Sequence, residues 1–366
     1  MPPVLTGRAL GRATLERQFL LRRSAVSALE AVRHLVGLQA QAANAPYVGL
    51  WSRLTSFAIS DLTALMVDRQ VVRSGSLRAT QHITTAEDYL WLRPLIQPVS
   101  LRQRQAGFGR RTAGVDLGEL AAVASDLLAG RTLTRPQLRD LLAERWPGRD
   151  AEALAWSVQC LLWIVHPPPS GTWGVGGATP FALAHEWIGR PVVTDPEPVP
   201  LVRRYLAAFG PATVKDVQTW SGLTRLRDVV ERMRPELRTF RDEAGAELFD
   251  LVDTPLPDPD TPAPARFLPE FDDLIVAHAD RRRLMTDADR KRTCVGSLVA
   301  PTFLIDGRVV GSWKLQRDRE TATLVIAPYR SLGEADRTAL EEEGARLLGF
   351  AAPAGRTRNV TFRPVD

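Results

Sequence analysis

Residues 211–253 read PATVKDVQTWSGLTRLRDVVERMRPELRTFRDEAGAELFDLVD and predict a small folding unit. Thr213 can cap a helix that runs through Trp220, and Thr224 can cap a second helix whose apolar residues recur on one face. Glu243-Ala244-Gly245 then separates two alternating strands, which indicates a hairpin. Two helices joined by a short turn and followed by a hairpin form the winged-helix plan, in which the second helix can enter a major groove.

The same plan occurs twice upstream. In the nearer copy, Thr134 caps a helix that ends at Trp146-Pro147-Gly148, Asp150 caps a second helix through Leu162, and a hairpin turns near Pro167–Gly171. The first copy is looser, with its elements expected at Thr14–Leu21, Val26–Leu38, Ile59–Asp68 and Val71–Ile83. A unit of roughly 75–100 residues that recurs predicts an array of small modules rather than one large sheet.

The composition changes after the third unit. Residues 252–273 contain six prolines and six acidic residues, which predicts an extended connector. Beyond the connector, Asp306-Gly307 is a strong two-residue hairpin signal. A further strand, an amphipathic helix and a last strand are expected at 321–329, 335–350 and 357–364. A small β-barrel or a curved sheet with one helix fits this pattern.

The overall composition excludes several classes of protein. The chain has 366 residues, of which 45% are hydrophobic and 24% charged, so it is not disordered as a whole. It has no apolar run of ~18 residues and no secretory pattern at its N-terminus, so we expect a cytoplasmic protein without membrane contact. The two cysteines and five widely spaced histidines predict neither a disulfide scaffold nor a metal site. We expect no cofactor.

The charge is unevenly distributed along the chain. Residues 1–240 contain 29 lysines and arginines against 20 acidic residues, a surplus of nine, whereas residues 241–366 contain 18 against 22. Codon bias in a GC-rich genome explains why 44 of the 47 basic residues are arginine, but it does not explain this asymmetry. A basic first two-thirds suits a polyanion such as DNA.

One polar segment differs from its surroundings. Residues 34–54 read HLVGLQAQAANAPYVGLWSRL, in which Gln39-Ala40-Gln41 places two amides around a small apolar residue. Pro46 would end or bend any helix that continues from Val26, so the glutamines are expected at a helix end or in a loop. Taken alone, the two glutamines could simply be a polar helix end.

Three segments together carry a more specific signal. LVGLQAQAANAPYVGLWSRL, SLRATQHITTAEDYLWLRPL and FLPEFDDLIVAHADRRR resemble the winged-helix DNA glycosylases of the AlkZ/YcaQ type, in the expected order and over essentially the whole chain. The resemblance implies tandem winged-helix modules in a C-shaped array followed by a small C-terminal β-barrel, an α+β fold. The modules would span 1–108, 109–196 and 197–254, and the connector and barrel 255–366. A monomer is expected.

The resemblance also implies a catalytic site. The family signature is Gln-Φ-Gln in one branch and Gln-Φ-Asp in the other, and Gln39-Ala40-Gln41 matches the branch known for unhooking interstrand crosslinks. Gln39 and Gln41 are therefore the expected catalytic residues. Residues that could contact DNA around them are Asn44, Arg78, Thr80, His82, Arg281 and Arg282. The alternatives are a structural hydrogen-bonding role for Thr80 and His82, a loop-holding role for Asn44, and a solvated basic face at the arginines.

Two amide side chains can catalyse base release only from an activated substrate. Guanine alkylated at N7 already carries positive charge and leaves as a neutral base, so a positioned water and stabilisation of the sugar cation are enough. The expected partner is thus double-stranded DNA with alkylated purines or crosslinks, at the nucleoid. With no lysine near the motif, a Schiff-base lyase step is not expected, and the enzyme should be monofunctional. The resemblance leaves two roles open, self-resistance to a DNA-alkylating natural product and general repair.

A second interpretation belongs to another class. A winged-helix transcription regulator or architectural DNA-binding protein would explain the basic charge and the repeated helices equally well. It predicts a dimer and a preferred operator sequence. Gln39-Ala40-Gln41 separates the two interpretations, because a regulator has no need of it.

Overall fold

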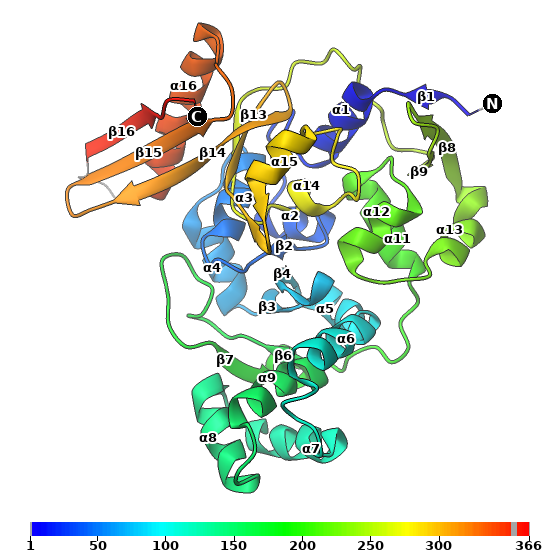
Figure 1. Cartoon of the computed structure of the whole chain (residues 1–366), viewed down its shortest axis with the longest axis vertical. Coiled ribbons are helices and arrows are strands. Elements are labelled where there is room, and N and C mark those ends of the chain that lie inside the picture. Colours follow the sequence, from blue (N-terminus) through cyan, green and yellow to red (C-terminus); the bar gives the residue numbers. More distant parts are fainter. Residues whose placement is uncertain (1, 353–356, 366) are drawn as a thin grey trace.

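The computed structural model describes residues 2–352 and 357–365. The helices and strands of these residues can be grouped into four units that follow one another along the chain. Figure 1 shows the second unit at the lower end, the third unit beside the N-terminus, and the C-terminal sheet on the opposite side of the central helices. The mixed α and β composition that the sequence predicts is confirmed. The assignment of the units as winged helices in a C-shaped array, with boundaries after residues 108, 196 and 254, stays a prediction.

The first unit surrounds a core of buried side chains that includes Tyr47, Leu62 and Ile83. Its elements are α1 (Gly7–Arg17), α2 (Ala28–His34), β2 (Leu38–Gln39), α3 (Ala45–Arg53), α4 (Ile59–Val67), β3 (Val71–Gly75), the 3-10 turn η1 (Leu77–Ala79), β4 (Gln81–Thr85), α5 (Ala86–Leu95) and α6 (Gln97–Phe108). The helix expected over Val26–Leu38 is shorter, because Val36 has a positive φ of 66° and the chain leaves the helix there.

The second unit follows the sequence prediction closely. Thr134 forms a capping box with Gln137 at the start of one helix, and Asp150 caps the next by accepting from the Ala153 N–H. Its elements are α7 (Leu117–Leu128), β5 (Leu133–Thr134), α8 (Arg135–Arg145), α9 (Ala151–Leu161), β6 (Ile164–Val165), β7 (Pro180–Leu183) and α10 (Ala184–Ile188). The strands β6 and β7 pair antiparallel as expected, but residues 166–179 connect them instead of a turn confined to Pro167–Gly171.

The third unit packs around Trp220, whose ring lies 5.0 Å from that of Tyr205, centroid to centroid. Its elements are α11 (Val199–Phe209), α12 (Val214–Ser221), α13 (Arg227–Met233), the 3-10 turn η2 (Arg234–Glu236), β8 (Leu237–Asp242) and β9 (Glu247–Leu251). The predicted cap at Thr224 is wrong. The helix begins later because Arg225 adopts a left-handed φ of 61° and Gln218 Oε1 accepts from the Leu226 N–H.

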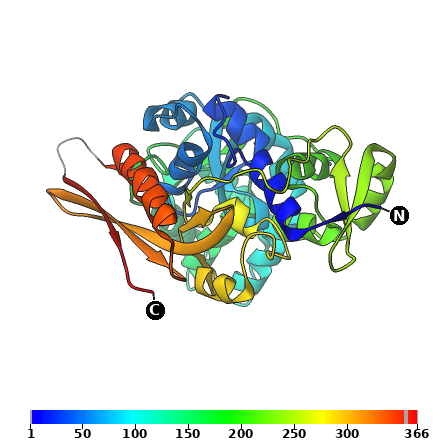
Figure 2. The same ribbon diagram turned by 90° about the horizontal axis from the view of Figure 1, so that it is seen from above.

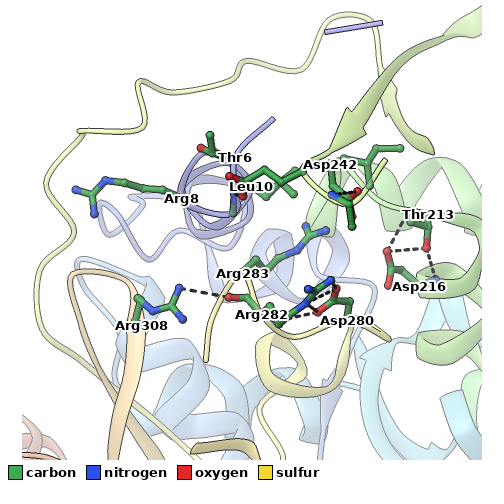
Figure 3. Close-up of a pocket in the computed structure, with 14 residues that line it drawn as sticks. Thr6, Arg8, Leu10, Thr213, Asp216, Asp242, Asp280, Arg282, Arg283 and Arg308 are labelled. Carbon is green, nitrogen blue, oxygen red and sulfur yellow. Dashed lines mark hydrogen bonds and ion pairs between the residues drawn. The ribbon is translucent and has the colours of Figure 1, made fainter. Parts of the chain in front are cut away.

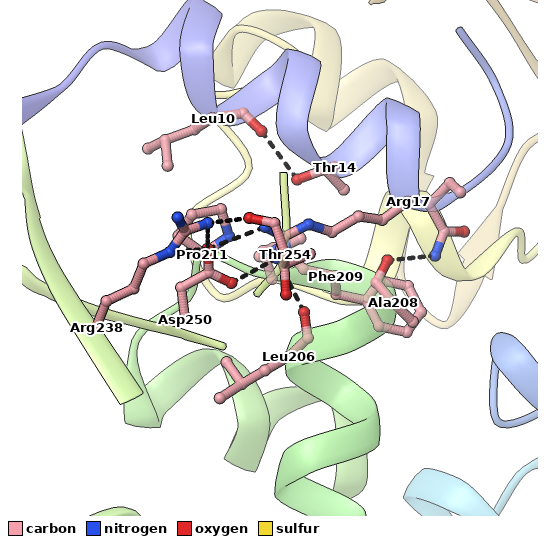
Figure 4. A network of polar contacts seen from close by, with 12 residues as sticks. Leu10, Thr14, Arg17, Leu206, Ala208, Phe209, Pro211, Arg238, Asp250 and Thr254 are labelled. Atoms are coloured by element: carbon pink, nitrogen blue, oxygen red, sulfur yellow. Dashed lines mark hydrogen bonds and ion pairs between the residues drawn. The ribbon is translucent and has the colours of Figure 1, made fainter. Parts of the chain in front are cut away.

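The N-terminus is fastened to the third unit rather than only to the first. The strand β1 (Val4–Leu5) pairs in parallel with β8. On α1, the Arg17 guanidinium donates to Asp250 at 2.6 and 2.9 Å, and Arg238 donates to the same carboxylate at 2.8 Å (Figure 4). Because Asp250 is fully buried, this pairing holds α1 against the third unit.

The fourth, C-terminal unit contains an open sheet and not the expected barrel. Its elements are β10 (Arg266–Leu268), α14 (Asp273–Val276), α15 (Asp287–Thr293), β11 (Cys294–Val295), β12 (Leu298–Val299), β13 (Thr302–Ile305), β14 (Arg308–Arg317), β15 (Thr321–Pro328), α16 (Glu334–Ala351) and β16 (Thr357–Phe362). Five of these seven strands form one sheet in the order β10-β13-β14-β15-β16, while β11 pairs with β12, and among the described residues the two outer strands of the sheet do not pair with each other.

The sheet stays open because a helix covers its apolar face. Leu324 and Ile326 of β15 pack with Leu347 of α16, which Figure 2 shows lying along the sheet. Gly344 permits this close approach, since a Cβ there would lie 2.8 Å from Leu324 Cδ2. A face that is already buried gains little from closing into a barrel. The predicted Asp306-Gly307 turn is confirmed.

Candidate active site

Gln39 lies on a short strand that begins directly after a tight turn. Helix α2 ends at His34, and Gly37 then adopts a φ of 150°. A Cβ at Gly37 would lie 3.0 Å from Thr84 Cγ2, so glycine is required for the chain to approach β4. In the ladder, Gln39 is the partner of His82. Pro46 stands in the first turn of α3, so Gln39-Ala40-Gln41 lies between two helices, but Gln39 falls on the strand β2 rather than at the expected helix end or in a loop.

Gln39 is held by the partly buried Arg78 and the buried Asp273. Its Oε1 accepts a hydrogen bond from Arg78 Nη2 at 2.8 Å, and its backbone N–H donates to Asp273 Oδ2 at 3.3 Å. Arg78 Nη2 also donates to Asp273 Oδ1 at 2.9 Å. With only 8% of its surface exposed, Gln39 has a fixed orientation.

Gln41 is exposed and contacts the same neighbouring segment. Its Oε1 accepts from the Gln81 N–H at 2.8 Å, and the Ala40 N–H donates to the Gln81 carbonyl at 2.7 Å. The guanidinium of Arg73 donates to the Ala40 carbonyl at 3.2 and 3.1 Å. The tripeptide is therefore fixed by its backbone, while the Gln41 side chain reaches solvent.

The segment that both glutamines contact is conformationally strained. Arg78 and Ala79 have positive φ values of 54° and 53°, which cost about 1–3 kcal/mol each for residues other than glycine. The third unit helps to hold this conformation, because Arg78 Nη1 donates to the Trp220 carbonyl at 2.7 Å. Strain of this kind, maintained by surrounding contacts, is typical of functional sites.

The titratable groups at the site have perturbed pKa values. Burial, assisted by the charge of Arg78, lowers the pKa of His82 to about 3, so the ring is neutral at pH 7. Burial also raises the pKa of Asp273, and the neighbouring Arg78 opposes this effect. His82 therefore cannot donate a proton as an imidazolium near neutral pH.

A second buried ion pair lies next to Gln39 and Asp273. Arg53 donates to both oxygens of Asp272 at 2.9 and 2.8 Å, and these two side chains are almost fully buried. A cavity of about 10 Å³ lies between this pair, Gln39 and Asp273. Its size and its polar lining match a single water molecule.

The remaining residues expected near the glutamines have local partners. Asn44 Oδ1 accepts from the Gly174 N–H at 2.8 Å, which ties the glutamine loop to the second unit. Thr80 Oγ1 donates to the Leu77 carbonyl at 3.1 Å. His82 is fully buried, and its ring nitrogens lie 3.0 Å from the Thr80 carbonyl and 3.4 Å from Arg78 Nη2. The structure thus brings Arg78 and His82 to Gln39, while Thr80 bonds within its own segment, and DNA contact by any of them stays a prediction.

Arg281 and Arg282, which were expected to contact DNA around the glutamines, do not contact either glutamine. Arg282 is exposed, pairs with Asp280, and lines a cavity of about 540 Å³ together with Arg8 and Arg308 (Figure 3). Arg281 Nη1 lies 3.1 Å from Cys294 Sγ. Among the described residues, no hydrogen bond or ion pair joins Arg281 or Arg282 to either glutamine.

Asp273 and Gln81 are the site residues that sequence reasoning missed. Asp273 lies within FLPEFDD and Gln81 beside His82, so both stand inside segments that carried the resemblance. The signal was present, but nothing local indicates that a residue 234 positions away meets Gln39.

The described residues contain no group of three or more His, Cys, Asp or Glu side chains that could hold a metal ion. None of the helices in the described ranges has both the length and the apolar composition needed to cross a bilayer.

Comparison with known proteins gives three findings. A family model described as DNA glycosylase AlkZ-like matches residues 32–350. An interstrand DNA cross-link repair glycosylase from Streptomyces sahachiroi is 26% identical, over 91% of this chain and 93% of that protein. The solved structure of the Streptomyces sahachiroi DNA glycosylase AlkZ matches 98% of this chain and 100% of its own, with a TM-score of 0.80 and 22% identity.

Proposed function

The chain belongs to the AlkZ-like DNA glycosylase family, and from this premise we propose that it hydrolyses the N-glycosidic bond of N7-alkylated purines in double-stranded DNA. We extend the proposal to bulky adducts and interstrand crosslinks, because the similar Streptomyces sahachiroi protein is named for cross-link repair. The reaction would take place on chromosomal DNA in the cytoplasm, with the enzyme acting as a monomer.

The observation that carries the proposal is the pair of glutamines. Gln39 is fixed by Arg78 and Asp273, while Gln41, two residues along, reaches solvent. An amide that is already oriented needs no reorganisation during the reaction, which is the basis of electrostatic preorganisation. The exposed Gln41 can meet a substrate that stays within the duplex, as a crosslinked base must while it is tethered to both strands.

The chemistry follows from the charge of the substrate. N7-alkylguanine carries a positive charge, so its departure as a neutral base needs no protonation by the enzyme. One glutamine oxygen would accept a hydrogen bond from the attacking water, and the other would stabilise the positive charge that develops at C1′. The low pKa of His82 agrees with this division of labour, since the site needs no general acid.

A monofunctional reaction is part of the proposal. The three lysines of the chain are Lys215, Lys291 and Lys314. None of them lines either cavity beside the glutamines, as far as the described residues show. A Schiff base requires such an amine at the reacting carbon. The product would be an intact strand with an abasic site.

The biological role follows from substrate range. We propose general repair if simple N7-methylguanine is a good substrate, and self-resistance to a DNA-alkylating natural product if only bulky adducts are excised.

The test uses two duplexes, one with a single N7-methylguanine and one crosslinked between guanine N7 atoms on opposite strands. Purified protein should release the base from both, and strands should break only after treatment with hot alkali. Strand cleavage without alkali would contradict the monofunctional reaction. Tight binding to both duplexes without base release would contradict the glycosylase and favour a binding protein.

A further inference from the structure

A cavity of about 300 Å³ opens beside Gln41, between the hairpin β3–β4 of the first unit and helices α6 and α9. Gln41 and Gln81 line one side, and Phe108 and Trp156 line another. Ligand pockets in proteins have volumes of about 300–1,000 Å³, so this space is large enough for a bicyclic ring. Gln41 thus borders this cavity as well as the proposed reaction site.

The lining of this cavity carries no charge. None of the residues that line it is Asp, Glu, Lys or Arg, and burial lowers the pKa of His166, the one histidine among them, to about 3. The cavity beside Arg282, by contrast, is lined by ions of both signs. A pocket without charged groups does not suit a phosphate or a free cation.

Part of the cavity lining is aromatic. The rings of Phe108 and Trp156 are stacked, with centroids 5.9 Å apart and planes 11° from parallel. The Arg135 guanidinium lies 3.9 Å from the Trp156 ring centroid and helps to fix it. Such a surface binds planar rings by stacking, whatever their exact substituents.

The polar groups of the cavity are amides. Gln41, Gln81, Gln103 and Gln159 can each donate and accept hydrogen bonds. Gln81 Oε1 is buried and has no hydrogen-bond partner among the described residues. An unpartnered buried acceptor calls for a donor, and an N–H group of a heterocyclic ligand would supply one.

We propose that this cavity binds an uncharged planar ring of the substrate. This proposal rests on the proposed glycosylase function. The ring has two possible sources with the same chemistry. It is either the modified purine, which loses its positive charge as the glycosidic bond breaks, or a planar group that the adduct carries at N7. In both cases the ring stacks on Phe108 and packs beside Trp156, and the amides contact its edge.

Gly75 offers a way to fill the cavity without substituting either glutamine, and it is the ladder partner of Gln81. It lines the cavity, a Cβ there would meet nothing within 4 Å, and its φ is not in the left-handed region. Gly75→Leu should therefore occupy the space while the chain still folds. Gly107→Leu is the matched control, because Gly107 is exposed, equally open, and outside the lining.

The experiment compares kcat/KM on duplexes that contain N7-methylguanine or N7-benzylguanine. A loss of about tenfold or more for the benzyl adduct alone assigns the cavity to the adduct, and an equal loss for both assigns it to the purine. Trp156→Leu should weaken the same substrates as Gly75→Leu. Rates within twofold of wild type for both substrates in both variants would overturn the proposal.

A binding measurement separates this proposal from the proposed function. Free 7-benzylguanine should bind the wild type and Gly107→Leu, and should bind Gly75→Leu about tenfold more weakly, as observed by ligand NMR. Binding with this pattern but no base release from any duplex would support the cavity and contradict the glycosylase. Base release without any difference in binding among the three proteins would contradict the cavity alone.

Discussion

Arg78 is the residue on which the site depends most, because one guanidinium contacts Gln39, Asp273 and the third unit. We expect Arg78→Met to lower the free energy of unfolding by about 3–5 kcal/mol, since it leaves Asp273 buried without its partner. Base release should fall as well, because Gln39 is no longer oriented. Urea unfolding and single-turnover kinetics measure the two effects.

The double variant Arg78→Met/Asp273→Asn distinguishes positioning from stability. Removing both charges should recover most of the lost stability, while the rate of base release stays low. Arg282→Met, which alters an exposed pair, is the control and should leave stability unchanged. Full activity in the double variant would show that Arg78 does not position Gln39.

At the scale of single residues, the sequence indicated candidate site residues but not which side chains they contact. Gln39 and Gln41 were predicted because a family signature marks them. Asp273 was not, because its contact with Arg78 joins residues 195 positions apart. Local patterns contain no information about such a pair, and only the assembled fold brings the two side chains together.

The turn between β13 and β14 shows how a single element is fixed. Gly307 has a φ of 74°, and a Cβ there would clash with Leu15 Cδ1. Gly307→Ala should therefore lower the free energy of unfolding by about 3 kcal/mol, through backbone strain and a clash with α1. Thermal or urea unfolding measures the loss.

Gly296, in the turn between β11 and β12, provides the comparison. It has a φ of 61° and open space around its Cβ, so Gly296→Ala should cost only the backbone strain, about 1 kcal/mol. Equal losses at the two glycines would contradict the packing of the β13–β14 turn against α1.

Elements were predictable where the signal is local. The caps at Thr134, Asp150 and Thr213 and the turn at Asp306-Gly307 are confirmed, since each depends on a few neighbouring residues. The cap at Thr224 failed because a side chain eight residues before Leu226 supplies the hydrogen bond instead.

The molecule as a whole should be sensitive to acid. Burial lowers the pKa of His82, His166 and His278 to about 3, below the unfolded value of about 6.5. Between these two pKa values the unfolded chain binds more protons than the folded chain. The stability that the neutral histidines contribute is therefore fully present above pH 6.5 and is lost as pH falls toward 3. From pH 7.5 to 5.5 each histidine should cost about 1–2 kcal/mol.

Urea unfolding at the two pH values tests this expectation. The wild type should lose about 4 kcal/mol over this interval, and His166→Gln about one-third less. A wild type whose stability is the same at both pH values would contradict the burial of neutral histidines.

The arrangement of the units was the least predictable feature. A repeated helical pattern indicates modules, but it does not show that β1 pairs with β8, because that register joins Val4 to Arg241. The expected barrel is an open sheet for a similar reason. Alternating strands are compatible with either form, and the choice depends on how α16 packs.

The central claim is that two positioned amides, Gln39 and Gln41, carry base hydrolysis. The most direct test is the single-turnover rate of N7-methylguanine release by the wild type, Gln39→Ala, Gln41→Ala and the double variant, each shown to be folded by its melting temperature. We expect a loss of about 100-fold or more in each single variant and no detectable release in the double. Near-wild-type rates in both single variants would contradict the account.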